Sequence, residues 1–247
     1  MADLLRRKVD LIAVVGTGAA LAAKKATSTI PIVLTGVGDP VAAGLVASLA
    51  RPEGNITGLS TLTPDLESKR LEVLKDVIPK LLRVGVIRPP ENSTGQRLQL
   101  EKLRAAAVSL NLRLEETETQ YEPGGLEKAF QTAKEKQVEA IITTAGPRMF
   151  KERKQIVALA DKYRMPAIYF QKEFVDEGGL MSYGVDYNEF FRRAAIYVDK
   201  ILRGTKPTEL PIETPTKFEF VISLKTAKQL GLPIPPNVLA RADRVIK

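Results

Sequence analysis

The sequence predicts an α/β fold with parallel sheets. Short apolar runs alternate with segments of helical periodicity along the whole chain, which is the pattern of strands joined by helical crossovers. Hydrophobic residues make up 44% and charged residues 27% of the 247 positions, so the chain can bury a sizeable core. Residues 30–58 show the pattern most clearly. A buried-strand run leads into a Gly/Asp/Pro loop, a small-residue helix and a second turn.

Strands are expected wherever a short apolar run is bounded by turn residues. In chain order they are predicted at residues 11–15, 30–35, 55–60, 83–87, 112–117, 140–144, 167–170 and 180–183. Between the third and fourth of these runs, helical periodicity predicts a helix over residues 65–78. Thr63 and Pro64 are suited to its start, and Pro79 ends it.

Two further apolar stripes predict helices around residues 100–110 and 188–203. Near the end of the chain, Ser223 can cap a helix through its hydroxyl group, and Gly231 can supply the left-handed conformation that ends it. The Pro-rich segment 232–247 is expected to lie along the surface.

The composition excludes several classes of function. The sequence contains no histidine and no cysteine, which removes the usual general base, the usual zinc and copper ligands, and thiolate nucleophiles. No catalytic residue, metal ligand or cofactor is therefore expected. The net charge is +8, but the 37 basic residues are interspersed with 29 acidic ones. This mixture is typical of solvated helix faces, so a nucleic-acid partner is not expected. No segment approaches the roughly 20 apolar residues of a membrane helix, so membrane insertion is not expected.

Polar residues directly after the predicted strands are the candidates for ligand binding, because ligands of open α/β sheets lie beyond the carboxyl ends of the strands. Thr35 and Asp39 follow the strand 30–35, although Asp39 can equally cap a helix that begins at Val41. Asn92, Ser93 and Thr94 follow the strand that ends at residue 87. Their hydroxyl and amide groups suit an anionic head group, and a helix cap is the alternative.

Five more candidates follow three later strands. Thr144 and Gly146 end one strand, where a small residue lets the backbone approach a ligand. Gln171, Tyr183 and Asp186 close the same edge of the predicted sheet. An aromatic ring with a nearby carboxylate suits an amino-acid-like ligand, because the ring stacks and the carboxylate accepts from an ammonium group.

Two enzymatic alternatives can be read from the same loops. Gly16, Thr17 and Gly18 follow a strand and open a helix, as in a nucleotide- or NAD-dependent α/β enzyme, and Asp39 lies at a plausible distance for a ribose contact. Leu21 stands where the third glycine of that fingerprint belongs. The second alternative is a glycosidase, which uses a pair of carboxylates. Four carboxylates lie close together in the sequence: Glu173, Asp176, Glu177 and Asp186. This clustering alone does not establish a glycosidase, since a solvated turn has the same composition.

Four motifs in order give the chain a family resemblance. They are Val14-Val15-Gly16-Thr17-Gly18-Ala19-Ala20, the stretch 30–58, residues 177–186 and residues 215–231. With these motifs, essentially the whole chain resembles the extracytoplasmic substrate-binding proteins of ABC transporters, in the branch that contains tryptophan- and tyrosine-binding lipoproteins.

The resemblance implies two doubly wound parallel-sheet lobes with a ligand cleft between them, the type 1 periplasmic-binding-protein fold, with the first lobe N-terminally truncated. The first lobe would hold residues 1–61 plus 188–204, and the second would hold residues 62–184. Residues 205–247 would form a crossover strand, a helix and the Pro-rich tail.

The resemblance also implies a function without catalysis. The protein would capture a small amino-acid-like, aromatic or anionic solute and deliver it, as a monomer, to the permease subunits of an ABC importer. Thr17 and the amide groups at its helix start would hold a ligand carboxylate. Family members work outside the cytoplasm, whereas residues 1–8 do not read as a secretory signal, so the chain expressed as given is expected to stay in the cytoplasm.

Overall fold

A computed structural model describes residues 1–90, 93–120 and 122–247. The chain forms two compact units. The first comprises residues 1–64, 93–98 and 186–217, and the second comprises residues 65–92, 99–185 and 218–247. Residues 205–247, expected to form one segment, are thus divided. Residues 205–217 belong to the first unit, where Ile212 packs into its core, and residues 218–247 continue the sheet of the second unit.

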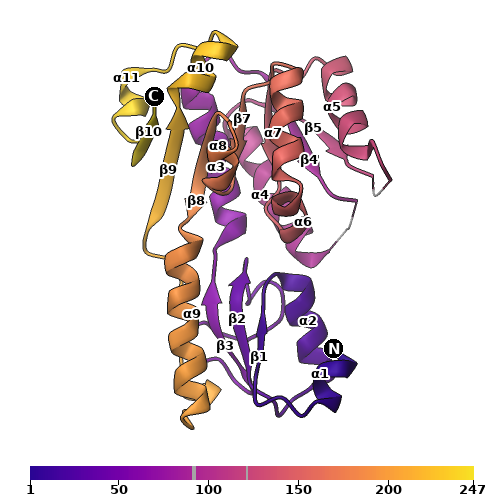
Figure 1. Ribbon diagram of the computed structural model, residues 1–247, viewed down its shortest axis with the longest axis vertical. Helices are drawn as coiled ribbons and strands as arrows, with labels where there is room; N and C mark the ends of the chain where they lie inside the picture. Colours follow the sequence, from indigo (N-terminus) through magenta and orange to yellow (C-terminus); the bar gives the residue numbers. More distant parts are fainter. Residues whose placement is uncertain (91–92, 121) are drawn as a thin grey trace. The chain divides into compact units, whose positions relative to one another are not determined.

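The first unit contains a parallel three-stranded sheet in the order β1-β2-β3 (Figure 1). Its core joins this sheet to α2, and α9 also contacts β2 and β3. The elements of the unit are α1 (Ala2–Arg6), β1 (Ile12–Val14), α2 (Thr17–Ala26), β2 (Ile32–Val37), β3 (Ile56–Ser60), α9 (Tyr187–Leu202) and the 3₁₀ turn η1 (Pro207–Glu209).

Residues after η1 run beside β3. The Ser60 amide donates to the Glu213 carbonyl (2.8 Å), and the Glu213 amide donates to the Gly58 carbonyl (3.0 Å). The Thr57 hydroxyl donates to the Leu210 carbonyl (2.6 Å). These bonds occupy one open edge of the small sheet, which reduces the unpaired backbone that an edge strand presents.

The second unit contains a seven-stranded sheet in the order β10-β9-β8-β7-β6-β4-β5, parallel except where β9 runs against β8. Its strands are β4 (Arg83–Arg88), β5 (Arg113–Glu118), β6 (Ala140–Thr143), β7 (Ala167–Tyr169), β8 (Met181–Val185), β9 (Phe218–Ser223) and β10 (Arg244–Ile246). Its helices are α3 (Thr63–Val77) and α4 (Thr94–Ser109), both beginning in the first unit, then α5 (Gly125–Glu135), α6 (Pro147–Lys151), α7 (Arg153–Lys162), α8 (Glu173–Asp176), α10 (Leu224–Leu230) and α11 (Pro236–Leu239).

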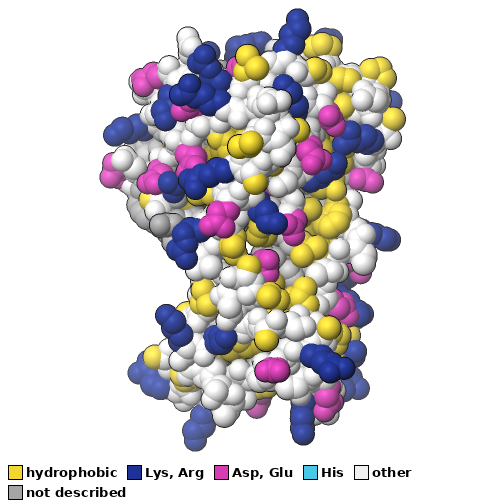
Figure 2. Space-filling view, turned by 180° about the vertical axis from the view of Figure 1, so that it is seen from behind, with side chains coloured by type: hydrophobic (Ala, Val, Ile, Leu, Met, Phe, Trp, Pro, Cys, Tyr) yellow, Lys and Arg dark blue, Asp and Glu magenta, His cyan; other side chains and the backbone are white. Residues whose placement is uncertain are grey.

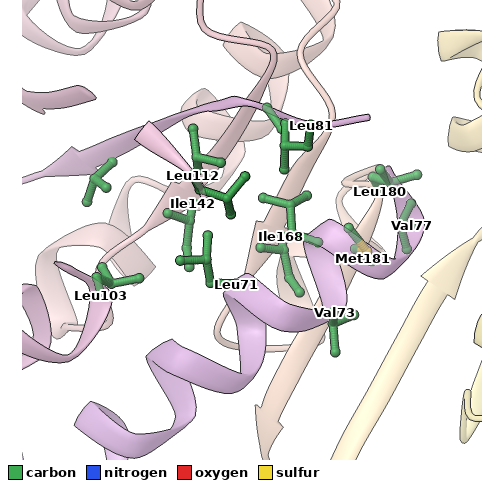
Figure 3. Packing of buried hydrophobic residues seen from close by; sticks show 14 of the residues in the cluster. Leu71, Val73, Val77, Leu81, Leu103, Leu112, Ile142, Ile168, Leu180 and Met181 are labelled. Carbon is green, nitrogen blue, oxygen red and sulfur yellow. The ribbon is translucent and has the colours of Figure 1, made fainter. Parts of the chain in front are cut away.

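Helices cover both faces of the large sheet. Successive strand residues point to opposite faces, and Ile141 and Ile142 of β6 accordingly belong to two different apolar clusters. Figure 3 shows the cluster in which α3 and α4, through Leu71 and Leu103, pack around Ile142. The other cluster joins the sheet to α5 and α7, with Phe130 fully buried in it. The doubly wound α/β class expected from sequence is confirmed.

Two local expectations are corrected. A helix was expected from Val41, but residues 40–44 form a single turn, because Gly44 takes a left-handed conformation (φ 69°) and Lys24 binds the carbonyl groups of Gly44 and Leu45. The Pro-rich tail does not only lie along the surface. It forms α11 and then β10, which pairs with β9 at the sheet edge.

Charged side chains are mixed on the surface. Figure 2 shows Lys and Arg side chains interspersed with Asp and Glu over the visible face, as expected for solvated helices. Within the described residues, none of the helices combines the length and the apolar character that crossing a membrane requires.

Candidate functional site

In the first unit, the carboxyl ends of β1 and β2 are joined by short contacts. The Gly16 amide donates to the Gly36 carbonyl (2.9 Å), so the loop after β1 is held against the end of β2. Gly36 (φ 147°) lies at a register shift of β2, and such bulges redirect the backbone at a strand end. Thr17, half-buried, begins α2, and none of the described side chains caps this helix. Its first-turn amide groups therefore keep hydrogen-bonding capacity for an anion.

The two candidates on the second loop have local partners. The Thr35 hydroxyl is buried and donates to the Val14 carbonyl (2.9 Å), linking two strands. The Asp39 carboxylate accepts from the amide groups of Val41 and Ala42 (3.0 and 2.9 Å). Both groups thus stabilise the loop itself, and Asp39 binds the amide groups of the turn at residues 40–44 in place of the expected helix.

At the start of α4, two candidate side chains also form hydrogen bonds within their own segment. The Ser93 hydroxyl accepts from the Gln96 amide (3.4 Å), and the Thr94 hydroxyl accepts from Arg97 (3.1 Å). Asn92, the third candidate of this loop, lies outside the described residues. Ser93 and Thr94 therefore act at the first turn of the helix, and their roles toward a ligand stay predictions.

Two buried polar side chains follow the carboxyl ends of β6 and β7. The Thr144 hydroxyl, directly after β6, is fully buried and has no hydrogen-bond partner among the described residues. The Gln171 side chain, shortly after β7, is 8% exposed. Gly146 precedes α6 and leaves open space where a Cβ would stand.

A buried polar cluster supports the loop after β6. Gln99 of α4 accepts from the Ala145 amide (2.7 Å) and donates to the Ala145 carbonyl (3.0 Å). Glu67 of α3 also accepts from the Ala145 amide (3.3 Å), and it forms an ion pair with Arg70 (3.2 Å). Glu67 and Arg70 are 0% and 1% exposed. The cluster fixes the backbone that carries Thr144 and Gly146.

Glu67 is the most perturbed acid of this cluster. Burial raises the pKa of its carboxyl group from 4.5 to about 7, although the Arg70 charge and the Ala145 amide both lower it. Its Oε2 atom is buried without a hydrogen-bond partner in the described residues. Perturbed, under-satisfied polar groups are typical of functional sites as well as of structural ion pairs.

Tyr183 lies at an open cavity, apart from the polar cluster around Ala145. Its ring stacks on Phe218 with centroids 6.0 Å apart, and the two residues line an open cavity of about 370 Å³. The remaining lining residues are Lys69, Val73, Phe220, Arg241 and Asp243, all of the second unit. Thr144 and Gln171 are not among them, so the structure does not bring all candidates of the second unit together.

Asp186 caps α9. Its carboxylate accepts from the Asn188 amide (3.0 Å), which is the N-cap contact that aspartate commonly makes. Among the carboxylates of the glycosidase alternative, Asp176 and Glu177 are engaged in ion pairs with Arg244 and Arg153. These contacts fit a structural role for those acids.

The comparisons with known proteins agree with this architecture. The family described as ABC transporter substrate binding protein matches residues 1–246. A tyrosine-binding protein of Clostridioides difficile is 28% identical over 235 residues, which cover 91% of this chain. The chain spans 64% of the length of that relative.

Two solved structures are similar over nearly the whole chain. A conserved domain protein from Vibrio cholerae has 30% identity and a TM-score of 0.89, covering 98% of this chain and 80% of that one. An ABC domain from Streptococcus pneumonia, solved in complex with L-Trp, has 26% identity and a TM-score of 0.84, covering 96% of this chain and 81% of that one.

Proposed function

Because the chain belongs to the family of ABC transporter substrate binding proteins, we propose that it binds a small aromatic, amino-acid-like solute outside the cytoplasm and delivers it to the permease of an ABC importer. The tyrosine-binding relative and the relative solved with L-Trp support the class of solute. No chemical conversion of the solute is part of this function.

The observation that carries the proposal in the structure is the pair of buried polar side chains beyond the carboxyl ends of β6 and β7, one of them without a hydrogen-bond partner among the described residues. The hydroxyl of Thr144 has no protein partner in the described residues, and the Gln171 side chain is buried. Both residues lie where open α/β sheets bind ligands. Burying such groups costs free energy unless a ligand or ordered water satisfies them. Gly146 leaves space for a ligand beside them.

In the first unit, the start of α2 by itself has a feature that suits an anion. Its uncapped amide groups, beginning at Thr17, suit a carboxylate, because the N-terminus of a helix carries partial positive charge. A solute that carries a carboxylate matches these amide groups. Neutral sugars lack the carboxylate and match them less well.

Isothermal titration with L-tyrosine, L-tryptophan, L-leucine and NAD tests the proposal. We expect an aromatic amino acid to bind, and Gln171→Ala to weaken its affinity by roughly ten- to a hundredfold, the scale of a lost hydrogen bond to a charged group. Gln155→Ala is the matched control, because Gln155 is exposed on α7.

Three results would contradict the proposal. They are the absence of heat with every amino acid, an equal effect of the two glutamine variants, and binding of NAD alone, which would support the nucleotide-dependent enzyme instead. Solute recovered unchanged after prolonged incubation is the expected result of the accompanying chromatography.

A further inference from the structure

The cavity beside β9 has the composition of a binding site, although the proposed solute site does not use it. Its volume of about 370 Å³ lies within the range of small-molecule sites, and a cavity of about 150 Å³ already holds benzene. All of its lining residues belong to the second unit, so the cavity is complete within one compact body.

Aromatic rings form one wall of this cavity. Tyr183 of β8 faces Phe220 of β9 across the antiparallel pair, and Phe218 lies two residues further on the same face. Tyr183 is stacked on Phe218 at an interplanar angle of 27° and tilted against Phe220 at 59°. Phe218 and Tyr183 are only partly buried, so their ring faces remain available to a planar ligand.

Two cations lie at the same cavity. Lys69 reaches it from α3, and Arg241 reaches it from the segment between α11 and β10. Each pairs with an acid of α3 that does not line the cavity: Lys69 with Glu72 (2.8 Å) and Arg241 with Asp76 (2.6 Å). All four side chains are at least 42% exposed, and such exposed pairs contribute little, so an incoming anion can compete with the acids.

The one acid that lines the cavity is held by the backbone. The Asp243 carboxylate accepts from the Phe220 amide (2.7 Å), and the Asp243 amide donates to the Phe220 carbonyl (2.9 Å). Asp243 therefore ties the start of β10 to β9 and fixes one side of the cavity. With Lys69 and Arg241, the lining residues carry two positive charges and one negative charge.

We propose that this cavity is a second binding site, which takes a small aromatic carboxylate with its ring against Tyr183 and Phe218 and its carboxylate at Lys69 and Arg241. The aromatic wall supplies stacking, and the two cations supply charge-assisted hydrogen bonds. An aromatic acid or the carboxylate end of an aromatic amino acid presents this chemistry equally.

The test is a ¹⁵N-¹H NMR titration of the full chain with 3-phenylpropionate. We expect the amide signals of Phe220 and Asp243 to shift in a saturable manner. Phe218→Ala should weaken binding by about fivefold, within the scale of one aromatic contact. Lys69→Gln should weaken it and reduce its dependence on salt, because one charge pair is removed. Phe191→Ala, which removes an exposed ring on α9, is the matched control.

Analogues of the probe separate its two parts. 3-Phenylpropanamide, which lacks the charge, and 3-cyclohexylpropionate, which lacks the aromatic ring, should each bind more weakly than 3-phenylpropionate. Saturable shifts confined to the neighbourhood of Thr144 and Gln171, or equal binding by Phe218→Ala and Phe191→Ala, would overturn the second site. Neither result would affect the proposed solute binding, which the Gln171→Ala variant tests separately.

Discussion

Glu67 carries a buried carboxyl group whose protonation should couple folding to pH. Its folded-state pKa of about 7 lies above the value of 4.5 for a free carboxyl group, so folding favours the protonated form. The resulting stabilisation is fully present below pH 4.5 and is lost as the pH rises through 7. Relative to wild type, the unfolding free energy of Glu67→Gln should therefore rise by about 2 to 3 kcal/mol between pH 5 and pH 8.

Urea denaturation of both proteins at several pH values measures this difference. Only the change with pH is diagnostic, because the glutamine also removes the charge that faces Arg70 and can lower stability at every pH. Glu101→Gln is the control, since Glu101 lies exposed on α4. Parallel stability curves for wild type and Glu67→Gln would show that the carboxyl group does not titrate between pH 5 and pH 8.

At the scale of single elements, Asp186 at the start of α9 can act as a helix cap, as a ligand-binding residue, or as both. Two substitutions of Asp186 distinguish these roles. Replacement by alanine removes the acceptor for the Asn188 amide and should cost about 1 kcal/mol of unfolding free energy, whereas asparagine also caps helices well. Asp186→Asn should therefore keep most of the stability while losing the charge. Denaturation and solute titration of both variants check this.

The two roles of Asp186 give different patterns. If the residue only caps α9, Asp186→Asn binds the solute as wild type does. If its charge also holds a solute ammonium group, Asp186→Asn loses affinity at nearly unchanged stability. Equal stability of the alanine and asparagine variants would contradict the capping role.

Helices and strands were predictable from sequence where their capping residues and apolar periodicity agree with the tertiary environment. The helix after Ser223 begins with the predicted hydroxyl cap and ends at Gly231 in the left-handed conformation. β10 was missed because a three-residue edge strand in a Pro-rich segment has no periodicity of its own.

The candidate site was predictable only in part. The rule that ligands lie beyond strand ends selected Thr144 and Gln171, and their roles toward a ligand stay predictions. The Thr144 hydroxyl is buried without a partner among the described residues, which fits such a role. Glu67 and Arg70 were missed, because an acid and a base three residues apart on a helix are indistinguishable in sequence from a solvated surface pair. Gln99 was missed because only its contact with Ala145 distinguishes it from any other polar helix residue.

At the scale of the whole molecule, the two compact units differ in the size of their cores. The first unit has one apolar cluster on a three-stranded sheet, and the second has two clusters on the faces of a seven-stranded sheet. The opening free energy of a unit rises with the apolar area that it buries, so the first unit should open at a lower free energy than the second.

Native-state hydrogen exchange tests this order of opening. Amide groups of β2 should exchange faster than those of β6, and Ile32→Val, which costs about 1 kcal/mol, should accelerate exchange in β1 to β3 by about fivefold. The same variant should leave the slowest amide groups of β6 nearly unchanged. Ile142→Val is the matched variant in the second unit, because Ile32 and Ile142 are both fully buried. Equal acceleration of both sheets by each variant would mean that the chain unfolds as one cooperative body. The first unit would then open only together with the second, at the free energy of global unfolding.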